Sequence, residues 1–247
     1  MPSPLAAFAS PIGRVLDRVR DAFDSPRAET VAVATLVVVT VGTSLGIVAL
    51  GGVFDATVDR QITVDNPDRP PESTCETFGD DPDSVFAEEC DEPARIEVDA
   101  GEELRDAASG YVHYGLLGVP LWWAFFAVAL HVGARVAGGS GSASDAFVIA
   151  GWAMAGELLR VAAGVAGIWY VLSNASVAGP TPEALANDVV AAVTSATGPL
   201  LAASAVAIAV QWVIVVAGLE ATYDLDRGVA AGVATFFAAI ALLIAAV

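Results

Sequence analysis

Residues 31–53 read VAVATLVVVTVGTSLGIVALGGV and contain no charged side chain. A helix needs about 20 apolar residues to cross the hydrocarbon core of a bilayer, which is about 30 Å thick. A helix also satisfies its own backbone hydrogen bonds in lipid, whereas this run lacks the alternation of a membrane β-strand. Residues 31–53 therefore predict a membrane-spanning helix.

Four further segments meet the same criterion of length and hydropathy. Together with the first they predict an all-α membrane protein, built as a bundle of five transmembrane helices. The last four helices would form a bundle within residues 111–247. They are predicted at residues 112–136, 146–173, 198–218 and 228–247.

The charge of the chain is concentrated between the first two predicted helices. The whole chain is 55% hydrophobic and still has a formal net charge of −18. Residues 54–110 hold 18 of the 29 acidic residues against four arginines, a local net charge of −14. This excess of acid excludes a nucleic-acid-binding protein, which needs a basic surface. Residues 54–110 are therefore predicted to form an acidic insertion outside the membrane.

The balance of acidic and basic residues also indicates a source. The chain has no lysine, and its 29 acidic residues face only 11 basic ones. Such a chain suits molar salt, where the Debye length is about 3 Å and self-repulsion is screened. We expect a halophilic archaeal origin.

The arginines ahead of the first span predict the orientation. Basic residues favour the cytoplasmic side of a membrane, so residues 1–30 are predicted to be cytoplasmic. Five crossings then place the C-terminus and residues 54–110 outside the cell, in a multi-pass protein of the cell membrane. Residues 1–30 also have an apolar stripe that suits an amphipathic helix on the membrane surface. The arginines are Arg14, Arg18, Arg20 and Arg27, and the stripe is Ile12, Val15, Leu16, Val19 and Phe23.

The acidic insertion contains Cys75 and Cys90, the two cysteines of the chain. A pair in an oxidising compartment predicts a disulfide, and the alternative is two free thiols in a disordered loop. Residues 61–65 and 95–99 alternate polar and apolar side chains on either side of it, which predicts two antiparallel strands. Asn174 begins an Asn-Ala-Ser sequon on the predicted outer face and is a candidate for glycosylation.

Glu157 and Arg160 lie near the centre of the third predicted span. Each would cost about 2.5–3.5 kcal/mol on insertion if it had no partner. Their i, i+3 spacing puts them on one helix face, where they can pair. A polar cluster inside the bundle is therefore expected, with partners at a similar depth on the first and fourth spans. Its predicted members are Glu157, Arg160, Gln211, Thr40, Thr43 and Ser44.

Two interpretations of this cluster stay open. The functional one is a proton or ion relay, since ionisable groups within a membrane often mark transport paths. The structural one is a neutralised pair that sets the register between helices. Two pairs of glycines at i, i+4, Gly42 with Gly46 and Gly228 with Gly232, are helix-contact motifs that serve either packing within the chain or dimerisation.

Catalytic motifs are missing from the sequence. It contains no HExxH, GxSxG or P-loop pattern, and no GxGxxG in a strand–helix setting. The two histidines, His113 and His131, fall at opposite ends of the second span and cannot share a metal ion. We expect no enzymatic activity, no cofactor and no metal site.

Several short stretches resemble the Yip-one domain family of five-span membrane proteins, in its haloarchaeal branch. They are Ser25-Pro26-Arg27, HVGARVAGGSGS at residues 131–142, FVIAGW at 147–152, Gln211-Trp212, GLE at 218–220 and DLDR at 224–227. The resemblance covers residues 11–53 and 112–247. Family members usually have a proline in the third span, where this chain reads Ala155-Gly156-Glu157.

The resemblance implies a fold and a membrane location. Eukaryotic members interact with small Rab-type GTPases, but this chain lacks their cytosolic acidic–tyrosine motifs, so that role is not carried over. The leading hypothesis is a membrane scaffold or protein-interaction module. The alternative is a small transporter or channel that uses Glu157 and Arg160. The expected partners are the lipid bilayer, further copies of the chain or other membrane proteins, and no nucleic acid.

Overall fold

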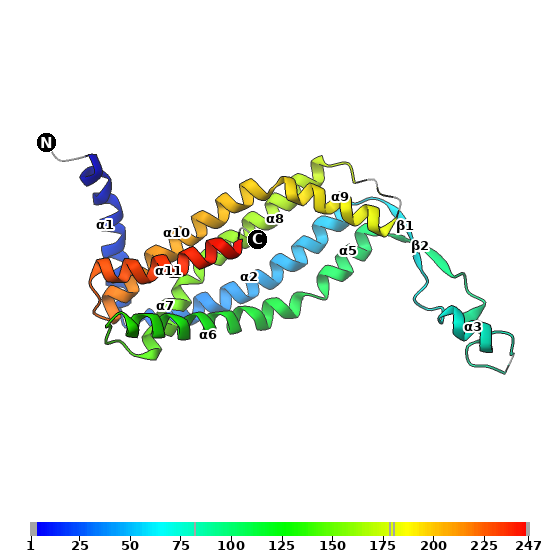
Figure 1. Cartoon of the computed structure of the whole chain (residues 1–247), viewed down its shortest axis with the longest axis horizontal. Coiled ribbons are helices and arrows are strands. Elements are labelled where there is room, and N and C mark those ends of the chain that lie inside the picture. The colour runs from blue at the N-terminus through cyan, green and yellow to red at the C-terminus, as the bar shows by residue number, and fades with distance from the viewer. Residues whose placement is uncertain (1–3, 82, 178, 180, 246–247) are drawn as a thin grey trace. The chain divides into compact units, whose positions relative to one another are not determined.

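The computed structural model describes residues 4–81, 83–177, 179 and 181–245, with side chains from residue 13 on. The described residues are mostly helical and include one two-stranded sheet (Figure 1). They divide into two compact units, which are described separately. Unit 1 comprises the described parts of Met1–Ala49, Ser109–Gly167 and Ala196–Val247, and unit 2 comprises those of Leu50–Ala108 and Ile168–Ser195.

Unit 1 is a helical bundle. Its helices are α1 (Pro4–Phe23), α6 (Val112–Val136), α7 (Ala143–Ala153), α10 (Thr197–Thr222) and α11 (Arg227–Ala245), with the larger parts of α2 (Ala28–Thr57) and α8 (Ala155–Asn174).

Five helical stretches of the described chain are long and apolar enough to cross a membrane, which confirms the prediction of five such helices. Large apolar side chains such as Val37, Leu121 and Phe125 are exposed on them, as expected of surfaces that face lipid. The five stretches are Ala28–Thr57, Ala100–Val136, Ala143–Asn174, Thr197–Thr222 and Arg227–Ala245.

The third stretch differs from the continuous helix predicted at 146–173. It begins earlier, at Ala143, because Ser142 and Asp145 form a reciprocal capping box at its start. It is also interrupted at Met154, which separates α7 from α8. After the interruption, Glu157 N–H donates to the carbonyl of Met154 at 2.9 Å. This bond joins residue i to residue i−3, as in a 3₁₀ turn, whereas an α-helix joins residue i to residue i−4.

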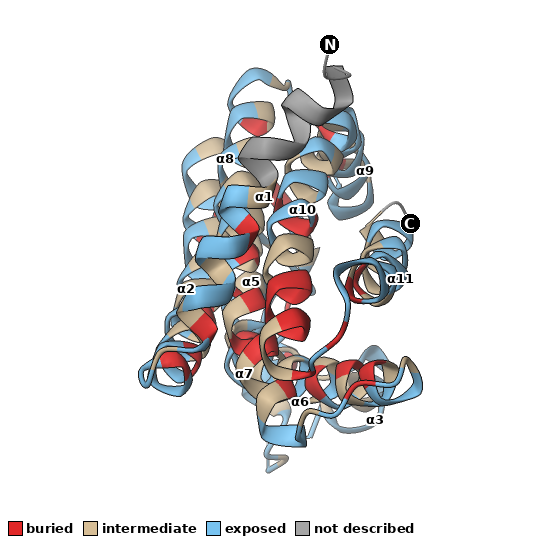
Figure 2. Cartoon of the chain, turned by 90° about the vertical axis from the view of Figure 1, so that its left-hand side faces the viewer, coloured by how far each residue is buried: buried red, intermediate tan, exposed pale blue. Residues whose placement is uncertain are grey.

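The core of unit 1 lies where α6, α7, α10 and α11 meet. Leu130, Ile149, Val216 and Leu219 are fully buried there, and Figure 2 shows the buried residues gathered most densely along α10. Small residues such as Ala134 complete this core, because they let the helices approach closely.

The N-terminal helix α1 packs against α10. Leu16 and Phe23, two members of the predicted apolar stripe, are buried in the core of unit 1, whereas Val15 is half exposed. The side chain of Ile12 lies outside the described residues. The stripe therefore covers protein in part, since α10 presents apolar surface to α1.

Unit 2 contains the predicted ribbon. Strands β1 (Gln61–Asp65) and β2 (Arg95–Asp99) pair antiparallel, with Ile62 opposite Val98. Ile62 and Leu185 belong to a small buried cluster, which gives the two strands an apolar surface to cover. The prediction of two antiparallel strands is confirmed.

Short helices complete unit 2, and the sequence did not predict them. They are α3 (Glu72–Phe78), α4 (Ala87–Cys90), α5 (Ala100–Ser109) and α9 (Pro182–Ser195) (Figure 1). A disulfide joins Cys75 in α3 to Cys90 in α4, with the two Cα atoms 5.4 Å apart, which confirms the predicted bridge. Residues 54–110 are thus a folded, cross-linked segment.

Candidate functional site

Glu157, Arg160 and Gln211, all half-buried, form a polar cluster between α8 and α10 in unit 1. Arg160 Nη1 lies 3.2 Å from Glu157 Oε2, and Gln211 Nε2 donates to Glu157 Oε1 at 2.7 Å. Each carboxylate oxygen therefore has its own donor, one charged and one neutral. The acid is on α8 and the amide on α10, so this contact also connects two of the membrane-spanning helices.

Two features of α8 place Glu157 in this position. The interruption at Met154 starts a new helix, and Glu157 falls in its first turn, where a carboxylate is favoured by the helix dipole. Gly156 then brings α8 close to α10: a Cβ at this position would lie 2.8 Å from Gln211 Cγ and 3.0 Å from the carbonyl oxygen of Ala207. A larger residue at 156 would push the amide of Gln211 away from Glu157.

The cluster is not enclosed on every side. The side chain of Arg160 is 35% exposed and that of Glu157 20% exposed. Arg160 Nε is buried and has no hydrogen-bond partner among the described residues. A Cβ at Gly164, one turn further along α8, would meet no described atom within 4 Å. Open space therefore adjoins the pair on α8.

The predicted hydroxyl members of the cluster bond elsewhere. Thr40 Oγ1 donates to the carbonyl of Leu36 at 2.8 Å, and Ser44 Oγ donates to that of Thr40 at 2.9 Å. Hydroxyls within a helix commonly bond back to the preceding turn in this way. Thr43 is half-buried on the same helix. The structure thus brings Gln211 to Glu157 and Arg160, and uses Thr40 and Ser44 within α2.

Helix α2 is held by close contacts at glycines. A Cβ at Gly42 would lie 2.7 Å from Leu158 Cδ2, and one at Gly46 would meet Val161, so the first glycine motif serves packing of α2 on α8. In the second motif, neither Gly228 nor Gly232 has a described atom within 4 Å of an added Cβ. The two motifs therefore have different environments.

Asn174, the candidate glycosylation site, is the last residue of α8. It is exposed, and its Nδ2 donates to the carbonyl of Tyr170 at 2.7 Å. Modification at Nδ2 would replace this local bond.

A second polar assembly, which we call the α1 junction, lies where α1 meets the bundle. Its members are Phe23, Trp152, His131, Ser142, Tyr223, Arg227, Glu220 and Asp17. The rings of Phe23 and Trp152 are 5.1 Å apart, and Trp152 Nε1 donates to the carbonyl of Ala28 at 3.0 Å. These contacts fix the turn between α1 and α2 against α7.

Tyr223 is the centre of the α1 junction and is fully buried. The Tyr223 hydroxyl donates to the carbonyl of Ser142 at 2.7 Å. His131 Nδ1 lies 2.7 Å from the hydroxyl oxygen of Tyr223. Because the hydroxyl proton goes to Ser142, His131 must donate through Nδ1. Burial, aided by the nearby carboxylate of Asp145, raises the pKa of Tyr223 to about 12, and Arg135 opposes this shift.

The glycine-rich segment after α6 encloses the Tyr223 ring. A Cβ at Gly141 would lie 2.7 Å from Tyr223 Cγ, and one at Gly139 would lie 3.0 Å from Cδ1. Ser140 N–H donates to the backbone carbonyl of Tyr223 at 3.0 Å. Glycine is needed at these two positions because the aromatic ring approaches the backbone directly.

Arg227 ties three helices together at the α1 junction. Its Nε donates to Glu220 Oε1 at 2.8 Å, and its Nη2 donates to Asp17 Oδ1 at 2.9 Å. The carboxylate of Glu220 is buried, and its Oε2 has no hydrogen-bond partner among the described residues. Arg227 on α11 thereby connects α10 with α1.

Sequence reasoning did not identify Tyr223 or Glu220 as site residues. A readable signal existed for part of the junction: Ser142 and Asp145 have the spacing of a capping box, which fixes where α7 begins. Four of the six stretches quoted for the family resemblance contribute to the α1 junction or to its core. They are residues 131–142, 147–152, 218–220 and 224–227.

The described residues contain no group of three His, Cys, Asp or Glu side chains placed to hold a metal ion. The polar cluster and the α1 junction offer paired charges and hydrogen bonds that connect helices, which is chemistry suited to fixing a bundle.

Comparison with known proteins identifies the family. A family model described as the Yip1 domain matches residues 5–247, a range that includes the acidic residues 54–110. No match was found among curated proteins or among solved structures. Since the matched range is nearly the whole chain, and its membrane-length helices fit such a protein, the chain belongs to the Yip1 domain family.

Proposed function

We propose that this Yip1-domain chain is a non-enzymatic, multi-pass membrane protein that acts as a scaffold or protein-interaction module. One observation carries the proposal: both oxygens of Glu157 are occupied, by Arg160 and by Gln211. A carboxylate held in this way is neutralised within the bundle and sets the register of α8 against α10.

The proposed topology has a cytoplasmic N-terminus and an extracellular C-terminus in the cell membrane of a halophilic archaeon. The arginines of α1 support the first part. The Cys75–Cys90 disulfide supports an outside location for unit 2, since disulfides persist in oxidising compartments. After mild reduction, a membrane-impermeant maleimide should label these two cysteines on intact cells. Labelling that requires lysed cells would contradict the topology.

The alternative is a small transporter or channel, and one structural feature favours it. The helix that carries Glu157 is interrupted at Met154, and transporters often build their sites at broken helices. The open space beside Gly164 and the partial exposure of Arg160 would give an ion access to the pair.

The double substitution Glu157→Gln with Arg160→Gln tests the two functions. It keeps two polar side chains of similar size and removes both charges. A scaffold should keep its oligomeric state and show no proton or ion flux in proteoliposomes before or after the change. Flux in the wild-type protein that the double variant loses would support the transporter instead.

The single substitution Arg160→Ala is the matched comparison. It leaves the Glu157 carboxylate without its cationic partner, and an unpaired charge in the bundle is strongly destabilising. We expect poor insertion and aggregation of Arg160→Ala, whereas the double variant folds. If Arg160→Ala folded normally, the Glu157–Arg160 pair would not be needed for the structure of the bundle, and the proposed structural role of the pair would be wrong.

A further inference from the structure

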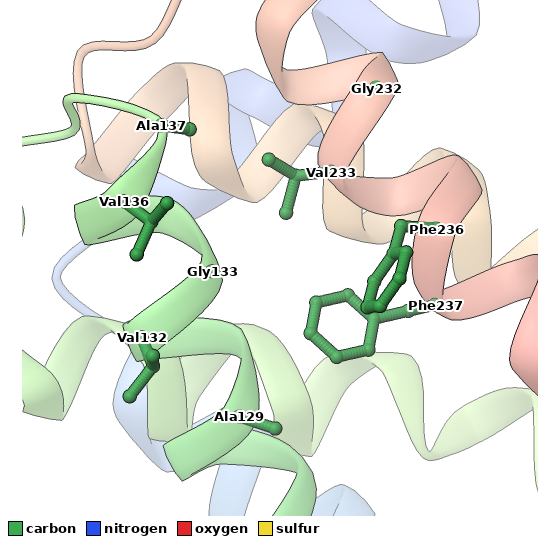
Figure 3. A pocket seen from close by; sticks show the side chains of 9 residues that line it. All are labelled: Ala129, Val132, Gly133, Val136, Ala137, Gly232, Val233, Phe236 and Phe237. Atoms are coloured by element: carbon green, nitrogen blue, oxygen red, sulfur yellow. The ribbon is translucent and has the colours of Figure 1, made fainter.

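An apolar groove of about 600 Å³ lies between α6 and α11 in unit 1 (Figure 3). Every lining residue is apolar or glycine, so the groove has no group that would select one apolar occupant over another. Groups that can select a partner, which are directional hydrogen-bond donors and acceptors together with charges, are exposed on the sheet of unit 2 instead.

Strand β2 has one edge that no strand of the described chain covers. Just beyond the ends of the two strands, Ala100 N–H donates to the carbonyl of Arg60 at 2.8 Å, and Asn66 N–H donates to that of Ala94 at 3.0 Å. Hydrogen-bonded pairs alternate along an antiparallel ladder, so every second residue of β2 bonds to β1. The residues between them, at odd numbers, turn their backbone N–H and C=O groups to the opposite edge.

This open edge is short, because both of its ends are closed. Pro93 precedes the strand and has no N–H to donate. At the other end, Asp99 Oδ1 accepts from Gly101 N–H at 2.9 Å, and the chain turns into helix α5. Arg95 and Glu97 remain between these ends. Their side chains are exposed, and their outward backbone groups have no hydrogen-bond partner among the described residues.

The charges of the open edge fit a second copy of the same strand. Charged side chains on an edge strand usually prevent pairing. Two antiparallel copies of β2 related by a two-fold axis at Ile96, however, place Arg95 of each copy opposite Glu97 of the other. A register centred on Glu97 would instead put two carboxylates opposite each other. Strand β1 has no basic residue, so its own edge offers no such match.

The apolar face of the ribbon fits the same arrangement. Ile62 of β1 is buried, whereas Ile96 and Val98 of β2 are only half-buried. Ile96 also lies outside the small buried cluster that contains Ile62 and Leu185. Pairing of two β2 strands brings the two copies of Ile96 together on one face and joins the two ribbons into a single sheet. A sheet with more than two strands is more stable than an isolated ribbon.

We propose that unit 2 binds a second copy of this chain through the edge of β2, with two-fold symmetry at Ile96. Arg95 and Glu97 of each copy exchange backbone hydrogen bonds and form ion pairs with Glu97 and Arg95 of the other. Copies held in one membrane meet at a high effective concentration, so a small interface suffices. The inference gives the proposed scaffold a partner and rests on that function. Its tests leave Glu157 and Arg160 unchanged, so either proposal can fail by itself.

Cysteine cross-linking of the full chain in membranes tests the register. Ile96→Cys places two thiols in directly opposite positions with Cα atoms about 4.5 Å apart, close enough for a disulfide. Val98→Cys is the matched control, since Val98 is on the same face and also half-buried. Its two copies would be offset by about 13 Å along the strands, too far to bond. After mild oxidation, Ile96→Cys should give about tenfold more disulfide-linked dimer than Val98→Cys, with the wild type as background.

Charge variants in the Ile96→Cys background test the ion pairs. Arg95→Glu and Glu97→Arg each put like charges opposite each other in a dimer of identical chains, and each should cross-link about tenfold less. Co-expression of the two single variants with tags of different size restores opposite charges and should restore the mixed dimer. The double variant should also recover, although it keeps any defect that Arg95→Glu causes beside Asp65.

Three results would overturn the proposal. Equal cross-linking of Ile96→Cys and Val98→Cys would show that β2 does not pair about Ile96. Cross-linking of Ile96→Cys to Val98→Cys that exceeds cross-linking of Ile96→Cys to itself would assign the register centred on Glu97. A mixed dimer of the two charge variants no stronger than either variant alone would show that these charges act on the folding of unit 2 and not on its pairing.

Discussion

The contact between α8 and α10 should be highly sensitive to one added methyl group. Gly156→Ala places a Cβ 2.8 Å from Gln211 Cγ and 3.0 Å from the carbonyl oxygen of Ala207. The side chain of Gln211 can rotate away, but the Ala207 carbonyl belongs to the backbone of α10 and moves only with the helix. Relief of the clash therefore separates the two helices and lengthens the 2.7 Å bond from Gln211 to Glu157.

The magnitude follows from two opposing effects. Overpacking a close contact costs about 1–3 kcal/mol. Replacement of glycine by alanine in a helix contributes up to about 1 kcal/mol in the other direction. Gly164→Ala on the same helix has only the favourable effect, because its Cβ would meet no described atom within 4 Å. The free energy of unfolding should therefore be about 1–3 kcal/mol lower for Gly156→Ala than for Gly164→Ala.

Equilibrium unfolding in mixed micelles, followed by tryptophan fluorescence, measures this difference. Both variants should unfold with the same dependence on denaturing detergent, so that the midpoints report stability. If Gly156→Ala were as stable as Gly164→Ala, the close approach of α8 and α10 would not exist. The polar cluster would then lack the packing that positions Gln211.

Four further predictions concern other parts of the molecule. Tyr223→Phe leaves the Ser142 carbonyl without its donor and should lower the free energy of unfolding by about 1–3 kcal/mol in the same assay. The pKa of Tyr223 is raised to about 12 in the folded protein, so just above pH 10 the Tyr223 hydroxyl ionises only in the unfolded chain. The free energy of unfolding should therefore fall as pH rises from 10 to 12, and Tyr223→Phe should weaken this pH dependence. Cys75→Ser opens a loop closed over 15 residues and should cost unit 2 up to about 3 kcal/mol, seen as faster proteolysis between the two strands; an unchanged rate would mean that the ribbon needs no bridge. Arg227→Gln strands the buried carboxylate of Glu220 and should expose α1 to hydrogen exchange, and unchanged protection would show that apolar packing alone holds this helix.

Much of the fold could be predicted because its signals are local. A run such as residues 31–53 is long and apolar enough to specify a membrane helix without reference to the rest of the chain. The alternation of polar and apolar side chains predicts the strands β1 and β2, and Cys75 has only Cys90 to pair with. Composition and periodicity are properties of neighbouring residues, and they are readable before folding.

The start of the third membrane-length stretch, Ala143–Asn174, and its interruption at Met154 were harder to predict. Ser142 and Asp145 offered a capping signal, but apolar composition alone placed the start three residues later. The interruption at Met154 has no proline, and its Ala155-Gly156 neighbours tolerate several conformations. It is decided by how α7 and α8 pack on other helices.

The α1 junction could not be predicted from the sequence, for a different reason. Tyr223 and His131 are 92 residues apart in the sequence. Nothing in the sequence near Tyr223 indicates which backbone carbonyl its hydroxyl will meet. Burial of one aromatic ring among Gly139, Gly141 and Ser142 is a result of the bundle, not of a motif.

The sequence by itself determined that this protein has five membrane-length helices, an acidic cross-linked segment and a buried charge that needs a partner. Tertiary structure alone decided that Gln211 completes the environment of Glu157, that Thr40 and Ser44 bond within their own helix, and that α6 and α11 leave a groove between them. The physical reason is the range of the interactions: hydropathy acts residue by residue along the chain, whereas hydrogen-bond partners and gaps depend on helices that meet only after folding.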